Sequence, residues 1–184
     1  MDSPENLQMA QQRLEIHQQK LMQLEKLLEQ LSSHRNAAFQ AETQRALLNI
    51  AKICSEVMEC LRNIRTWCMP LFAENPKVEP GILDQDLQQL KDQGNQFNNV
   101  FDSFIRRTVS IRVEDNQMKF VQDVRKLLSS DTVCAICSKL SGMISNRNIP
   151  EIKRYGSLAA ILHQDLEKIM SDFTNDISAK VNGK

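Results

Sequence analysis

Apolar residues recur every three or four positions between residues 7 and 31. This N-terminal seam consists of Leu7, Ala10, Leu14, His17, Leu21, Leu24, Leu28 and Leu31, and mostly Gln, Glu, Lys and Arg lie between them. A narrow apolar seam on an otherwise polar helix is typical of a coiled coil, and such a helix is not stable alone in water. Ser3 and Pro4 suit a helix start. We therefore predict a helix within residues 1–33 whose seam another helix covers.

A second apolar stripe follows, out of phase with the first. It comprises Leu47, Ile50, Cys54, Val57, Leu61, Ile64, Cys68 and Leu71, and Ala46, Ala51, Ile53, Met58, Cys60 and Trp67 widen it. A stripe this wide indicates burial against more than one neighbour, so we expect this helix to be the most buried element. Polar residues 32–36 separate the two stripes, which predicts a turn or kink there; one long bent helix is the alternative.

The next helix follows a Pro- and Gly-containing loop at residues 74–81. Its predicted apolar face comprises Leu83, Leu87, Leu90, Gly94, Phe97, Phe101 and Phe104. Because glycine has no side chain, we expect a neighbouring backbone to approach closely at Gly94. Residues 109–113 alternate like a short strand, but no second strand is evident, so we interpret them as a helix end or connector.

Three further patterns complete the chain, and the last of them predicts another long helix. One face comprises Met118, Val121, Val124 and Leu128; the next comprises Val133, Ile136, Cys137, Leu140 and Ile144; the last comprises Tyr155, Ala159, Leu162, Leu166, Ile169, Phe173 and Ile177. Residues 129–131 are predicted to break the first of these helices and cap the second, and residues 146–150 to form a turn. The last helix is expected to begin near Pro150.

These patterns predict an all-α fold. Five Gly and five Pro are too few for the turns of an all-β chain of 184 residues, and aromatic residues make up only 5%. We expect an elongated antiparallel helical bundle over residues 36–182. The coiled-coil-type helix within residues 1–33 is either an arm or the first helix of that bundle.

Charge and cysteine content narrow the possible partners and compartments. Lys plus Arg equals Asp plus Glu at 23 each, which argues against a nucleic-acid partner. The five cysteines are an odd number, and no secretory leader is apparent, so we expect free thiols in the cytoplasm or the nucleus. No apolar run suggests a membrane-spanning helix.

Motifs for catalysis or cofactor binding are not evident. Glycine-rich phosphate loops and a Ser–His–acid arrangement are missing, so we expect no enzyme activity, cofactor, metal or small-molecule substrate. Cys134 and Cys137 form a lone C-x-x-C, which we interpret as core packing because a structural zinc site needs four ligands. Asp84 and Asp86 are interpreted as helix-capping or dipole-compensating residues.

Binding to another protein is the function that the sequence favours. The predicted partner-binding residues are Leu7, Leu14, His17, Leu21, Leu24, Leu28, Leu31, Trp67 and Phe72. His17 is expected to set register or oligomeric state, or else to make a contact sensitive to pH. The cluster that contains Trp67 and Phe72 either closes one end of the bundle or forms a binding hot spot.

Two functional hypotheses follow. In the first, the chain is an adaptor or structural subunit, and its N-terminal helix pairs with a second copy or another protein. In the second, the chain is a monomeric bundle that binds anionic membranes, because residues 101–184 carry 13 basic and 10 acidic side chains. Basic residues in this half cluster near predicted helix ends, where they would also complement helix dipoles. We expect the membrane to be the less favoured partner.

Overall fold

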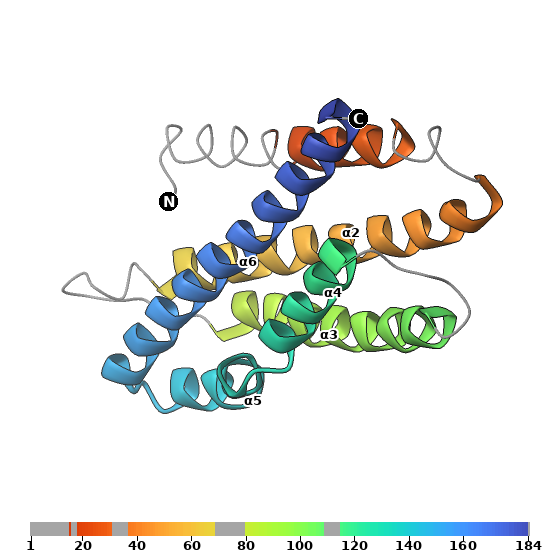
Figure 1. Ribbon diagram of the computed structural model, residues 1–184. Helices are drawn as coiled ribbons and strands as arrows, with labels where there is room; N and C mark the ends of the chain where they lie inside the picture. The colour runs from red at the N-terminus through yellow and green to blue at the C-terminus, as the bar shows by residue number, and fades with distance from the viewer. Residues whose placement is uncertain (1–14, 16–17, 31–36, 69–79, 109–114, 184) are drawn as a thin grey trace.

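The computed structural model describes residues 15, 18–30, 37–68, 80–108 and 115–183, and the regular elements in these ranges are all helices (Figure 1). The labelled helices are α2 (Ala37–Cys68), α3 (Pro80–Thr108), α4 (Asp115–Leu128), α5 (Asp131–Ser145) and α6 (Ile149–Gly183). Residues 18–30 form a further helical segment, which we call the N-terminal segment. The all-α prediction is confirmed. The predicted connector at residues 109–113 and most of the predicted loop at 74–81 lie outside the described residues.

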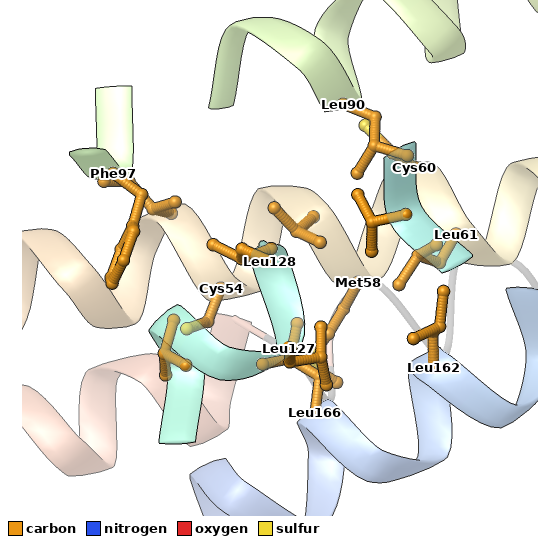
Figure 2. Packing of buried hydrophobic residues seen from close by; sticks show 14 of the residues in the cluster. Cys54, Met58, Cys60, Leu61, Leu90, Phe97, Leu127, Leu128, Leu162 and Leu166 are labelled. Atoms are coloured by element: carbon orange, nitrogen blue, oxygen red, sulfur yellow. The ribbon is translucent and has the colours of Figure 1, made fainter. Parts of the chain in front are cut away.

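Helix α2 lies between α3 and α6 at the centre of the bundle, and its predicted stripe is buried up to Cys68, while Leu71 lies outside the described residues. Leu47, Ile50, Cys54, Val57, Leu61, Ile64 and Cys68 all have exposed fractions of 0–1%. Figure 2 shows side chains of α3 and α6 converging on it from opposite sides, Leu90 and Phe97 from α3 and Leu162 and Leu166 from α6. The expectation that this helix is the most buried element is therefore confirmed, because it has neighbours on both sides.

Aromatic side chains and a helix cap fix the shorter helices. The rings of Phe120 in α4 and Phe173 in α6 stack with their centroids 4.0 Å apart. Between α4 and α5, the Ser130 hydroxyl accepts a hydrogen bond from the backbone N–H of Val133 at 3.3 Å. This cap satisfies one of the free N–H groups at the start of α5. The predicted break at residues 129–131 is thus confirmed.

The N-terminal segment folds back along α2 (Figure 1). The side-chain Nε2 of Gln44 in α2 donates a hydrogen bond to the backbone oxygen of Leu28 at 2.6 Å. In one straight helix these residues would lie about 24 Å apart, at 1.5 Å per residue. At the other end of the segment, Lys20 forms an ion pair of 3.5 Å with Glu167 of α6. The N-terminal segment and α2 therefore lie side by side as a hairpin, and the alternative of one long bent helix is wrong.

The close helix approach occurs at a different glycine from the one expected. A Cβ atom built at Gly94 would meet nothing within 4 Å, so the expectation of a close backbone approach there is wrong. A Cβ at Gly156 in α6 would lie only 2.7 Å from the Cβ of Cys68 in α2. The crossing of α2 and α6 therefore depends on the missing side chain at Gly156.

Asp84 and Asp86 connect helices and do not cap one. Helix α3 begins at Pro80 and has no acidic residue in its first turn, so the capping interpretation is wrong. Asn63 of α2 donates to Asp86 at 3.2 Å, and Ser141 of α5 donates to Asp84 at 3.4 Å. Burial raises the pKa of Asp86 above its usual value, and the hydrogen bond from Asn63 acts against that shift.

Candidate partner-binding surfaces

The chain's own helices cover part of the N-terminal seam. Leu24 and Leu28 are 0% and 2% exposed and belong to the same hydrophobic core as α2 and α6. Leu21 is half-buried and packs against that core. A partner could reach these leucines only by displacing the N-terminal segment from the bundle. Their part in partner binding stays a prediction.

Other predicted binding residues lie outside the described residues. These are Leu7, Leu14, His17, Leu31 and Phe72. Trp67 is described: it lies one residue before the end of α2, where it is half-buried and packs against the core. Its ring therefore contributes to closing that end of the bundle, one of the two roles that the sequence allowed.

A cavity of about 220 Å³ lies at the joint between the N-terminal segment, α2 and α6. Leu21, Met58 and Met170 contribute its apolar side chains, and polar residues such as Gln23 and Ser171 line the rest. Residues from all three elements line the cavity, so we interpret it as a local packing defect where the N-terminal segment meets α2 and α6.

A second and larger groove, which we call the α4–α6 groove, has a volume of about 390 Å³. Its lining residues are Asp123, Lys126, Leu127, Ser130, Thr132, Leu158, Ile161, Leu162, Asp165 and Ile169. Ile161 is 53% exposed, and among the described residues only Met22, at 55%, is another large hydrophobic residue in the exposed class. Ile161 was not among the residues predicted from the sequence to bind a partner, although Leu158 and Ile161 stand three residues apart beside the predicted core face of α6.

Some of the basic side chains near helix ends already have partners within the chain. The guanidinium of Arg125 lies 4.6 Å from the centre of the Phe101 ring, and Arg154 pairs with Glu151 at 3.3 Å. Arg125 and Lys126 occupy the last turn of α4, as their dipole role requires. Arg154 lies near the first turn of α6, where a positive charge opposes the dipole, so that explanation is wrong for this residue.

The cysteines differ in burial. Cys54 and Cys68 are buried as predicted, but Cys134 is exposed, so its assignment to the core is wrong; Cys137 is half-buried. Burial raises the pKa of Cys60 and of Cys68 to about 12 and that of Cys137 to about 11. At neutral pH these thiols are protonated, which makes them poor nucleophiles and metal ligands.

In the ranges that the structure describes, no group of three or more His, Cys, Asp or Glu residues is placed to hold a metal ion.

By length and composition, one stretch of the described chain, Asn116–Ser145, is apolar enough to cross a membrane. It consists of α4 and α5, of 14 and 15 residues, with the turn at residues 129–130 between them. A membrane-spanning helix needs about 20 consecutive residues. The stretch is therefore weak evidence for a membrane span.

Comparisons of the chain with protein-family models, with curated proteins and with solved structures found no match.

Proposed function

We propose that this chain is a non-enzymatic protein-interaction module, an adaptor or structural subunit, which binds a helix of another chain through Leu7, Ala10 and Leu14. The observation that carries the proposal is the division of the N-terminal seam. Its later part, Leu24 and Leu28, is buried inside the chain, while the same apolar spacing continues upstream to Leu7.

The upstream part of the seam needs its own cover. If the helix continues toward the N-terminus, Leu14 and Leu7 lie about 15 and 26 Å from Leu24, at 1.5 Å per residue. The described surface has only Met22 and Ile161 as exposed large hydrophobic residues, and Met22 lies on the N-terminal segment itself. Apart from the surface around Ile161, the described surface of the same chain therefore offers little apolar area to these leucines. Burying each leucine against a partner helix contributes about 1.5–3 kcal/mol.

The N-terminal segment is held on the bundle, which lowers the entropic cost of binding a partner. The ion pair between Lys20 and Glu167 and the burial of Leu24 hold the segment on the bundle before any partner arrives. A helix that is already positioned loses less conformational entropy on binding than a free peptide does. All five cysteines are unpaired, which supports a reducing compartment such as the cytoplasm or the nucleus.

Two variants of the full chain test this proposal. Leu7→Glu combined with Leu14→Glu places charges in the seam, and Gln12→Glu is the matched control on the opposite side of the helix. Self-association is measured by light scattering, and binding to other proteins by affinity capture from cell extract with mass spectrometry. We expect the double variant to lose an association that the wild type and the control retain. Associations that are equal in all three proteins, or missing from all three, contradict the proposal.

A further inference from the structure

The α4–α6 groove and the N-terminal segment lie on opposite sides of α6. Glu167, which binds Lys20, and Asp165, which lines the groove, are two residues apart in α6. Two residues correspond to a rotation of about 200° around a helix. A helix that continues from residue 18 therefore cannot enter this groove of its own chain, because α6 stands between them.

The groove offers an apolar floor of suitable length. On α6 it extends from Leu158 to Ile169, which is about 16 Å at 1.5 Å per residue. Residues 7–14 of a helix cover about 10 Å and present Leu7, Ala10 and Leu14 on one face. Leucines at this spacing are the usual anchors when an amphipathic helix binds in a groove.

The charges of residues 7–14 and of the α4–α6 groove are also complementary. Arg13 is the only charged residue within residues 7–14, and it stands beside Leu14, at the edge of the seam. Asp123, Asp165 and Lys126 give the groove a net charge of −1. Asp123 already pairs with Lys119 at 3.0 Å, whereas Asp165 is exposed at the groove. Asp165 is therefore the acidic group that suits Arg13.

We propose that the α4–α6 groove of one copy of this chain receives residues 7–14 of a second copy, and that the two copies exchange these segments reciprocally. Leu7 and Leu14 contact Ile161 and its apolar neighbours, and Arg13 pairs with Asp165. Reciprocal exchange uses each segment and each groove once and so closes the assembly as a dimer. This inference rests on the proposed function and deepens it, because it names both the partner and the receiving surface.

Light scattering of the full chain tests the apolar contact. Twice the chain mass of 21.1 kDa is about 42 kDa, which is the expected mass of the wild-type assembly. Ile161→Asp should raise the dissociation constant of the dimer at least about 30-fold, as for a central interface residue. Met22→Asp is the matched control, because Met22 is equally exposed but does not line the groove. Circular dichroism confirms that both variants remain helical.

A charge exchange tests the pairing of Arg13 with Asp165. Arg13→Asp alone and Asp165→Arg alone should each weaken the dimer roughly 5-fold, and the double variant should restore it. Restoration supports direct contact between these two positions. A double variant that is weaker than either single one contradicts the pairing and overturns the proposed binding pose.

Failure of this inference can be told apart from failure of the proposed function. A wild-type chain that stays at 21.1 kDa up to about 100 µM, or a dimer unaffected by Ile161→Asp, overturns the inference. If Leu7→Glu with Leu14→Glu still abolishes capture of another protein, the proposed function stands with a different partner. If that double variant changes no association, both proposals are wrong.

Discussion

Helices α2 and α6 have similar lengths, 32 and 35 residues, but the bundle covers them very differently. Helix α2 has α3 on one side and α6 on the other, and its Ile64 is 0% exposed. Helix α6 has α2, α4 and α5 as neighbours, yet its Ile161 is 53% exposed. Isoleucine thus has opposite surroundings at these two positions. Its place in the bundle determines whether it contributes to folding or remains available to a partner.

The largest expected effect is a loss of stability, and it tests directly whether Ile64 and Ile161 differ as their burial indicates. Ile64→Ala should lower the free energy of unfolding by about 2–5 kcal/mol, because it leaves a cavity between packed helices. Ile161→Ala should change it by less than about 0.5 kcal/mol, because solvent already surrounds much of the side chain. Urea unfolding of both variants at a concentration where the chain is monomeric gives the two values. Similar losses of unfolding free energy in both variants would contradict the difference in burial between Ile64 and Ile161.

The crossing of α2 and α6 is the next test. Gly156→Ala should lower the free energy of unfolding by about 1–3 kcal/mol, because the new methyl group meets the Cβ of Cys68 at 2.7 Å. That atom is attached to the backbone and cannot rotate away. Gly142→Ala in α5 is the control, since a Cβ there meets nothing within 4 Å. Thermal unfolding should separate the two variants, and a Gly156→Ala protein as stable as the control would refute the close approach.

A smaller effect of opposite sign is expected in α3. Gly94→Ala should raise the free energy of unfolding by about 0.5–1 kcal/mol, since a Cβ there meets nothing within 4 Å and alanine favours the helix. Urea unfolding measures the gain. Destabilisation would mean that a neighbour does approach Gly94, and that α3 is covered as tightly there as α2 is.

The smallest effect concerns the polar contact between α2 and α3. Because burial raises the pKa of Asp86 in the fold, the folded chain binds more protons than the unfolded chain near that pKa. The contribution of Asp86 to stability should therefore fall as pH rises from the unfolded pKa through the raised folded value. Asp86→Asn removes the free-energy cost of burying the ionised carboxylate and keeps a side-chain oxygen that can accept the hydrogen bond from Asn63. The variant should be slightly more stable than wild type at pH 7, and the difference should disappear below about pH 4. A difference that does not change with pH would rule out this origin.

Local pattern was enough to predict the helices and most of the core. The stripe of α2 and the aromatic face of α3 repeat every three or four residues, so each predicts its own buried side. Ser130 marks the break before α5 because capping depends on the residues beside it. Each of these features depends on residues within a few turns of one another.

Features that depend on contacts between distant parts of the chain could not be predicted from the sequence in the same way. The spacing of Leu24 and Leu28 is the same whether α2 or a second chain covers them, so the hairpin could not be derived from it. Gly94 and Gly156 look alike in sequence, and only the crossing of α2 with α6 separates them. Ile161 was missed because its exposure depends on where α4 ends relative to α6.

The position of α6 at the end of the described chain has a consequence for synthesis on the ribosome. Helix α2 emerges long before α6, yet α6 covers one of its two apolar sides. Until α6 is translated, side chains of α2 such as Leu61 are exposed to solvent or to any protein that binds them. A nascent chain that has reached only α5 is therefore a good substrate for chaperones and prone to aggregation. Slow decoding within α6 would lengthen that exposure and lower the yield of folded protein without changing a single residue.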